Sequence, residues 1–348
     1  MLLNQQIAEL LAREAEQTTF PAQRALRRAA RRAYIWEHEA TDLIREKRSL
    51  TELSGVGPFI EKLIKGWIAR PPRDTKSPPI RAGFLTWVQS RAVLQKNPRW
   101  PIGIKGDLQV HTNWSDGSGS IAEMVEAARQ LNYEYLAITD HAKGLKIAGG
   151  IDEAQVRKQA AEIASVNGTN GRTAALRSIE LNLNPEGKGD LSSSCLRKLD
   201  LVLGCFHSSL RKTEDQTKRY IAALNNPDIQ ILGHPRGRIY NHRVGLQADW
   251  KQVFESAAEL GKAVEIDGYP DRQDLSLDLV KTAFASGCRI SLSTDSHGPS
   301  QLRFMDYSAA SALMAGIGSE RILNLMTKDK LLGWVDDVRR NLRTAASV

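Results

Sequence analysis

Residues that can bind metal ions stand at regular places in this chain. Seven short, largely apolar runs each end on a histidine, an aspartate or a glutamate. The end points are His111, Asp140 with His141, Glu180, His207, His234, Glu265 with Asp267, and Asp295 with His297. Imidazole and carboxylate groups are common protein ligands of zinc, manganese and similar divalent ions. The pattern predicts a metal cluster if the fold brings the seven ends together.

The spacing of these end points predicts parallel strands. Successive ends lie 27 to 39 residues apart, which is the length of one strand and a returning helix. Polar residues in the intervening segments are typical helix starts, as at Ser118 or Ser120, Asp152 and Asp215, and further helices are expected over 248–260 and 276–286. In such a barrel the carboxyl ends of all strands meet at one mouth, where barrel enzymes have their active sites. We therefore expect an α/β fold with a seven-stranded (β/α) barrel over residues 105–348.

Histidines supply most of the candidate ligands. Five of the seven histidines, His111, His141, His207, His234 and His297, lie at the predicted mouth, whereas His38 and His242 lie elsewhere. Together with Asp116, Glu180 and Asp295 they are enough for two or three ions. Asp140 could accept a proton or orient a ligand, or it could be a structural cap. Glu265 and Asp267 could support the ligands or contact substrate.

Size and composition restrict the class of protein. The chain has 348 residues, 41% of them hydrophobic, which is ordinary for a globular protein and long enough for two domains. No apolar run approaches the roughly 20 residues that span a bilayer, and residues 1–17 are typical of an amphipathic helix and not of an export signal. Three scattered cysteines exclude a disulfide framework and a paired-cysteine zinc site. We expect a cytoplasmic protein without membrane contact.

Positive charge is concentrated near the start of the chain. Residues 1–105 contain 19 Lys and Arg against 10 Asp and Glu, whereas the remaining residues contain 29 against 30. Helical spacing covers residues 2–16 and 22–39, and the second segment carries Arg24, Arg27, Arg28, Arg31 and Arg32. Such an excess favours contact with a phosphate backbone. The alternative is a solvated surface that only keeps the protein in solution.

A glycine-rich turn follows the arginine segment. Gly55, Val56 and Gly57 separate a short helix predicted around residues 42–48 from one predicted over 58–68. This arrangement resembles the helix-hairpin-helix motif, in which glycine turns and a helix start approach the DNA backbone. It predicts a small all-α DNA-binding domain over residues 1–69, with Arg24, Arg28, Arg31, Gly55, Gly57 and Lys62 as candidate contacts. A packing corner between two helices is the alternative. Residues 70–104 are predicted to be a proline-rich linker with a bridging helix over 83–94.

The stretches DLQVHTNWSDG, ITDH, SIELN, CFHS, GHP and STDSH resemble the PHP family of metal-dependent phosphoesterases, in particular the PHP domain of bacterial family X DNA polymerases. The resemblance implies a distorted seven-stranded barrel with three metal ions, usually zinc or manganese. By position, His111, Glu180 and Asp295 would bind the first ion, Glu180, His207 and His234 the second, and Asp116, His141 and His297 the third. Gln109 stands where most members have a histidine. Because an amide oxygen is a weaker zinc ligand than imidazole, we expect a loosely held first ion or manganese there.

The same resemblance implies hydrolysis of phosphoester bonds in nucleic acid, DNA in particular, as a 3′-5′ exonuclease or a 3′-end processing enzyme of DNA repair. Glu180 would bridge ions, Asp140 would handle protons, and Arg236 is the first candidate for binding the substrate phosphate, ahead of Lys143, Arg211, Arg238, Arg272 and Arg303. Residues 70–104 are too few for a polymerase palm, so we expect no polymerase activity. A small-molecule phosphatase resembling histidinol phosphatase and a DNA-binding scaffold with a degraded metal site are the alternatives.

Overall fold

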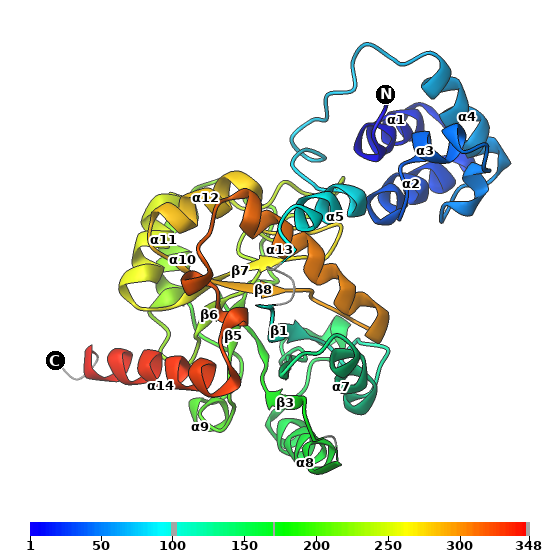
Figure 1. Ribbon diagram of the computed structural model, residues 1–348. Coiled ribbons are helices and arrows are strands. Elements are labelled where there is room, and N and C mark those ends of the chain that lie inside the picture. The colour runs from blue at the N-terminus through cyan, green and yellow to red at the C-terminus, as the bar shows by residue number, and fades with distance from the viewer. Residues whose placement is uncertain (99–102, 170, 346–348) are drawn as a thin grey trace.

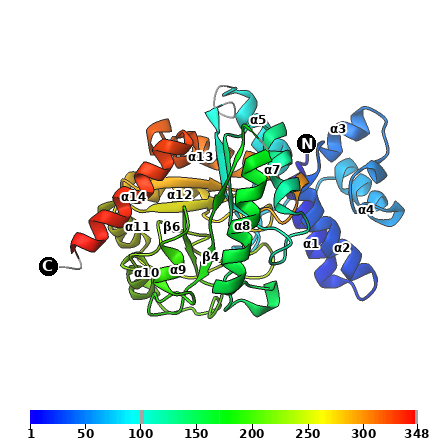
Figure 2. The same ribbon diagram turned by 90° about the horizontal axis from the view of Figure 1, so that it is seen from below.

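The computed structural model describes residues 1–98, 103–169 and 171–345. A group of N-terminal helices packs at one side of a barrel whose parallel strands are surrounded by helices (Figure 1). The last helix, α14 (Lys328–Ala345), lies on the opposite side of the barrel from the N-terminal helices (Figure 2). Among the described residues, no helix combines the length and the apolar character needed to cross a membrane.

The N-terminal helices form their own small core. Their bounds are Asn4–Gln17 for α1, Ala22–Arg32 for α2, Ala40–Arg45 for α3 and Pro58–Ala69 for α4. The second helix ends seven residues before the predicted end at residue 39. Residues Ala33–Ile35 tighten into a 3-10 turn, and Trp36 is extended, with its indole nitrogen donating to the Ser54 carbonyl at 2.9 Å. This tertiary contact overrides the helical pattern of the sequence.

All strands of the barrel run parallel. Their bounds are Gly106–Val110 for β1, Tyr135–Ile138 for β2, Ala174–Arg177 for β3, Glu180–Asn182 for β4, Leu203–Cys205 for β5, Ile231–Leu232 for β6, Ala263–Asp267 for β7 and Arg289–Ser293 for β8. They form two sheets, β1-β2-β3 and β4-β5-β6-β7-β8. Parallel bridges between His141 and Glu180 and between Val110 and Ser296 connect the two sheets at both of their meeting edges. The carboxyl ends of the strands therefore share one mouth.

The strand count differs from the prediction. The described residues contain eight strands where the sequence predicted seven, because the third predicted run is divided. Residues 174–177 pair with β2, and residues 180–182 pair with β5. The extended segment changes partners at Ser178 and Ile179, whose backbone groups still bond to Ile138 and Leu203. Hydrophobic patterning cannot distinguish one continuous strand from a segment that passes between two sheets.

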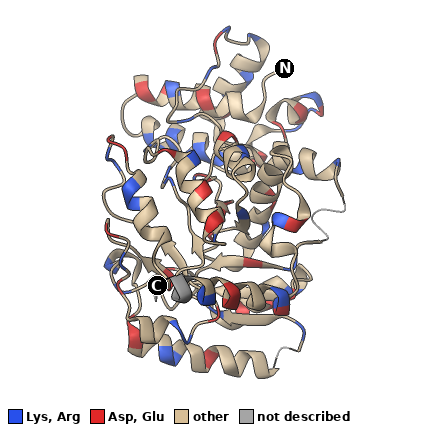
Figure 3. Cartoon of the chain, turned by 90° about the vertical axis from the view of Figure 1, so that its left-hand side faces the viewer, with Lys and Arg blue, Asp and Glu red and all other residues tan. Residues whose placement is uncertain are grey.

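Helices cover the outside of the strands. They are α7 (Ile121–Gln130), α8 (Glu153–Thr169), α9 (Ser193–Leu196), α10 (Thr217–Leu224), α11 (Trp250–Glu259), α12 (Leu277–Ala285) and α13 (Met305–Met314). Ser120 caps α7 in a capping box with Glu123, as the sequence predicted. Lysine, arginine and acidic residues are spread over helices and loops (Figure 3). The sequence did not predict α9, α13 or α14.

The predicted linker is anchored to both parts of the molecule. Arg81 bonds through Nε to Glu9 Oε2 at 2.9 Å and through Nη1 to Asn241 Oδ1 at 3.0 Å. Phe84 packs edge-on against Tyr34 of the N-terminal helices and Tyr240 of the barrel. The bridging helix α5 (Trp87–Gln95) packs beside α13 (Figure 1). Residues 81–87 are therefore a fixed connection between the two parts.

Candidate metal centre

Glu180 is the hub of the site. It is fully buried at the start of β4, at the seam between the two sheets. Its Oε1 lies 2.7 Å from His207 Nε2 and 2.6 Å from His234 Nε2. Its Oε2 lies 3.0 Å from His141 Nδ1 and 3.4 Å from His111 Nε2. One carboxylate thus meets four imidazoles that come from both sheets.

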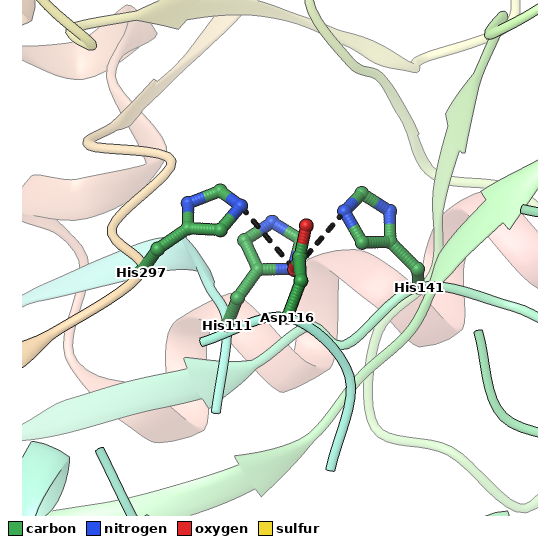
Figure 4. Close-up of side chains that lie close together, drawn as sticks. All are labelled: His111, Asp116, His141 and His297. Carbon is green, nitrogen blue, oxygen red and sulfur yellow. Dashed lines mark ion pairs between the residues drawn. The ribbon is translucent and has the colours of Figure 1, made fainter. Parts of the chain in front are cut away.

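Asp116 is a second meeting point of imidazoles. Its Oδ1 lies 3.5 Å from His141 Nε2 and 3.3 Å from His297 Nε2 (Figure 4). The His111 ring stacks against both His141 and His297, with ring centroids 4.4 Å apart in each pair. The close-up shows the three imidazoles gathered around the Asp116 carboxylate. This group forms the second half of the cluster.

Asp295 closes the cluster on the side of β8. Its Oδ1 lies 2.9 Å from His111 Nε2, and its Oδ2 lies 3.0 Å from Nε of Arg272. Asp295 and His234 both have positive φ angles, 51° and 22°, which residues other than glycine rarely adopt. Such backbone conformations concentrate at functional sites.

The described residues contain four overlapping groups of potential ligands, and within each group the ligand atoms lie within 4.8 Å of one another. They are His111, Asp116, His141 and His297; His141, Glu180 and His207; Glu180, Cys205 and His234; and His111, Glu180 and Asp295. The last group equals the predicted first set. The predicted second set is divided between two groups, because Glu180 is grouped once with His207 and once with His234. The residues of the predicted third set form one group, which also contains His111. Nitrogen and carboxylate donors in this proportion suit zinc or manganese.

Buried polar atoms without partners also fit bound cations. Among the described residues, His111 Nδ1 and His234 Nδ1 are buried and form no hydrogen bond within the protein. Both amide atoms of Gln109 are buried without a partner as well. Gln109 lies on β1, two residues before His111, which directly follows the strand. Gln109 is therefore placed where a weak oxygen ligand could act.

The carboxylates and imidazoles shift each other's pKa. Burial lowers the pKa of His141, but Glu180 and Asp116 outweigh it and raise that pKa to about 10. Burial raises the pKa of Glu180, but His141, His207 and His234 outweigh it and hold the pKa well below its ordinary range. The buried carboxylates thus favour positive charge beside them. A bound divalent ion would supply this positive charge in place of the protons that the imidazoles lose.

Asp140 lies outside this cluster. Its oxygens accept hydrogen bonds from the Thr112 backbone N–H at 2.8 Å, the Thr112 hydroxyl at 2.7 Å and the Gln159 amide at 2.6 Å. The Ser115 hydroxyl also donates to it. These bonds fix the loop between β1 and Asp116, so the structure favours the cap over the predicted proton-handling role.

Glu265 and Asp267 support the ligands from β7. Glu265 accepts hydrogen bonds from the backbone N–H of His234 at 2.5 Å and from the Ser293 hydroxyl at 2.6 Å. Burial raises the pKa of Glu265 to about 8. Asp267 Oδ2 lies 4.0 Å from Arg272 Nε. The pair therefore positions His234 and Arg272, which was one of the two predicted roles.

The six candidate basic residues separate into two groups. Lys143 pairs with Glu153, Arg303 pairs with Glu37, and Arg211 bonds to His242. Arg238 donates to the carbonyls of Arg272 and Gly83, and its guanidinium lies 3.8 Å from the centroid of the Phe84 ring. Arg236 keeps a buried Nε without a partner among the described residues, and Arg272 contacts Asp295. Arg272 thus contacts the predicted ligand Asp295, and Arg236 follows the predicted ligand His234 by two residues.

Sequence reasoning missed one potential ligand. Cys205 is fully buried, and its Sγ groups with Glu180 and His234. Burial raises the pKa of this thiol well above its ordinary value. Its position two residues before His207, on the same face of one extended segment, was the available signal.

The predicted DNA-binding residues belong to α2, the glycine turn and α4. Arg24, Arg28 and Arg31 are exposed on α2, and Lys62 is exposed on α4. Gly55 has a φ of 82°, and Gly57 is the N-cap of α4. The turn rests on α2, because a Cβ added to Gly55 would lie 3.4 Å from Cγ of Arg32. The arginine helix and the glycine turn are thus neighbours.

Comparison with known proteins finds that part of the chain matches a protein family. Residues 107–269 match the family model described as the PHP domain. The Bacillus subtilis protein named DNA polymerase/3′-5′ exonuclease PolX is 34% identical over 222 residues, which is 64% of this chain and 39% of that protein. A probable phosphatase of Caldanaerobacter subterraneus is 29% identical over 168 residues, 46% of this chain and 61% of that protein. The chain thus spans less than two thirds of either relative.

A solved structure gives a weaker likeness. The histidinol phosphate phosphatase of Lactococcus lactis, complexed with zinc, L-histidinol and phosphate, aligns with a TM-score of 0.44 and 16% identity. The alignment covers 62% of this chain and 94% of that one. At this score the likeness bears on neither substrate nor metal.

Proposed function

Since the chain contains a PHP domain, we propose that it is a metal-dependent phosphoesterase that hydrolyses phosphoester bonds in nucleic acid. The observation that carries the proposal is the meeting of four imidazoles on the buried Glu180 carboxylate. Bound divalent ions would supply an activated water and stabilise charge on the phosphoryl oxygens. DNA is the expected partner.

The residues around the cluster have distinct tasks in this proposal. Glu180 fixes the spacing of the ligands from the two sheets, and Glu265 holds His234 through its backbone. Arg272 holds Asp295, while the partly exposed Arg236, two residues after His234, binds a substrate phosphate. Deep burial of these groups strengthens their electrostatic effect on a phosphoryl group.

We propose a 3′-5′ exonuclease or 3′-end processing reaction. This is supported by the similarity to the Bacillus subtilis protein, whose name includes a 3′-5′ exonuclease, and by the arginines of α2. A small-molecule phosphatase is the second candidate, because several relatives are named probable phosphatases. A scaffold with a degraded site would bind little metal.

A substrate panel tests these alternatives. The full chain, purified without chelator and loaded with Mn²⁺ or Zn²⁺, is given end-labelled DNA, end-labelled RNA and small phosphomonoesters. We expect shortening of labelled strands from the 3′ end. Hydrolysis of phosphomonoesters with intact strands would contradict the nucleic-acid proposal, and fewer than about one ion per chain would favour the scaffold. A primed template with deoxynucleotides, added to the panel, should give no extension.

A variant pair connects the activity to the cluster. Glu180→Gln should lower hydrolysis at least about a hundredfold, because losing even a support of a metal ligand costs 10- to 100-fold. Glu255→Gln, a surface change on α11, is the matched control. Retained turnover in Glu180→Gln, with its metal content unchanged, would show that this cluster is not catalytic.

A further inference from the structure

Four arginines of α2 face the same way. Arg24, Arg27, Arg28 and Arg31 recur every three or four residues, so they form one helical face. Leu26, Ala29 and Ala30 of the same helix are buried in the N-terminal core, and all four arginines are exposed. Within the described part of the chain, none of the four forms an ion pair with a carboxylate. This arginine face therefore carries an excess of positive charge, although Arg31 interacts electrostatically with the Asp271 carboxylate.

The arginine face is turned toward the barrel. It lines a cavity of about 610 Å³, here called the α2 cavity, whose other wall includes Asn241 and His242 after β6. The acidic residue lining it is Glu16, whose Oε1 accepts a hydrogen bond from Arg81 at 2.5 Å. His242 accepts from Arg211 at 2.9 Å, which adds another cation at the rim. The α2 cavity is thus built for anions.

A second cavity adjoins this face and is lined in part by neighbours of the metal centre. It has a volume of about 550 Å³ and is here called the mouth cavity. Arg31 and Arg32 line both cavities.

Tyr269 and Gln301 line the mouth cavity on the barrel side. The side-chain oxygen of Gln301 accepts a hydrogen bond from the backbone N–H of His297 at 2.7 Å. The ring centroids of Tyr269 and His297 lie 6.1 Å apart. Asp271 also lines this cavity. The mouth cavity is therefore lined by two residues that contact the predicted ligand His297.

We propose that the α2 cavity and the mouth cavity form one track for the phosphodiester backbone of a single polynucleotide strand, whose end lies at the metal centre. The inference rests on the proposed function and names its substrate class. Guanidinium groups bind phosphates bidentately, and a partly exposed aromatic ring such as Tyr269 suits a stacked base. A small phosphomonoester has one phosphate and cannot use both ends of the track.

The track is a composite site, because the N-terminal helices are fixed to the barrel. Arg81 joins Glu9 to Asn241, and the Tyr307 hydroxyl donates to the Tyr34 carbonyl at 2.6 Å. Tyr240 of the barrel is part of the N-terminal core. Removing the N-terminal helices would therefore expose this core, so point variants in the full chain are the appropriate test.

Direct binding tests the track without relying on turnover. Labelled single strands of DNA and of RNA, about 4 to about 20 nucleotides long, are titrated into the His234→Ala protein over a range of salt concentrations, with fluorescence anisotropy as readout. Arg27→Ala with Arg28→Ala should weaken binding about tenfold and reduce the salt slope by about 0.7 for each lost phosphate contact. Comparing DNA with RNA identifies which backbone is preferred.

The control pair removes the same charge elsewhere. Arg157→Ala with Lys158→Ala changes two exposed cations on α8 that line neither cavity, and it should change affinity less than about twofold. Equal weakening by both pairs, or by neither, would overturn the track. Inorganic tripolyphosphate that competes as well as a strand of equal phosphate content would overturn it too. Hydrolysis by the chain without these substitutions is measured separately, so the proposed function stands or fails on its own.

Discussion

At the scale of single residues, Glu180 shows how burial and charge combine in this site. A carboxyl group buried alone favours its protonated form, because burial disfavours charge. Around Glu180 the imidazoles reverse that preference and lower its pKa. The carboxylate is thus kept charged in the barrel interior, which is the state that a metal ion requires.

Gln109 gives the clearest prediction at this scale. Gln109→His should tighten the binding of the most weakly held ion about tenfold, because imidazole replaces an amide with unpartnered, buried atoms. Elemental analysis after dialysis against graded chelator measures the effect. Gln109→Met, which removes the donor, should bind no more metal than the natural chain. A histidine variant that also fails to gain metal would show that residue 109 points away from the ions.

At the scale of elements, the broken strand explains the central position of Glu180. The extended segment of residues 174–182 leaves the first sheet after β3 and joins the second as β4. Glu180 is the first residue after this change and bridges to His141. It can therefore reach His111 and His141 from one sheet and His207 and His234 from the other.

Lys262, which directly precedes β7 and bonds to the segment that follows α10, predicts that the stability of the fold depends on pH. Lys262 is fully buried, its Nζ donates to the Asn226 carbonyl at 2.5 Å, and burial lowers its pKa from 10.5 to about 7. Between these values the unfolded chain holds a proton that the folded chain lacks, so this residue makes stability rise with pH. The contribution is about 1.4 kcal/mol for each pH unit in that window.

Urea unfolding of Lys262→Met and of the natural chain measures this effect. From about pH 7 to about pH 9.5, the natural chain should gain up to about 3 kcal/mol relative to the variant. Lys281→Met, an exposed change on α12, should show no such relative gain. A constant difference between Lys262→Met and the natural chain over this range would mean that Lys262 stays charged in the fold.

At the scale of the whole molecule, the N-terminal helices and the barrel behave as one body. The connection depends on Arg81, whose side chain is 6% exposed and which pairs with the fully buried Glu9 and with Glu16. Aromatic packing of Tyr34, Phe84 and Tyr240 adds to it. This contact holds the arginine face of α2 toward the barrel mouth.

Arg81→Met should lower the free energy of unfolding by about 3 kcal/mol, because it leaves a buried carboxylate with one of its two arginine partners missing. It should also speed tryptic cleavage at Arg73 and Lys76. Arg91→Met, which breaks a half-exposed pair with Asp306, is the control and should cost less than about 1 kcal/mol. Equal, small losses in the two variants would show that the two parts are only loosely joined.

Local patterns predicted much of the fold and the composition of the site. The βα alternation, the helix starting after Ser120 and the position of candidate ligands at strand ends follow from short-range periodicity. The end of α2 and the division of the third strand did not. Trp36 leaves the helix to reach Ser54, and residues 178–179 change sheets, so both depend on contacts between distant parts of the chain.

Apart from Cys205, the sequence by itself determined which residues could bind metal, because residue type and strand length place them at one end of parallel strands. Only the tertiary structure decided their partners. Four imidazoles contact Glu180, and the arginines of α2 face the barrel. Asp140 accepts hydrogen bonds from Thr112, Ser115 and Gln159. The reason is physical: periodicity fixes the face of an element, whereas long-range packing fixes what that face meets.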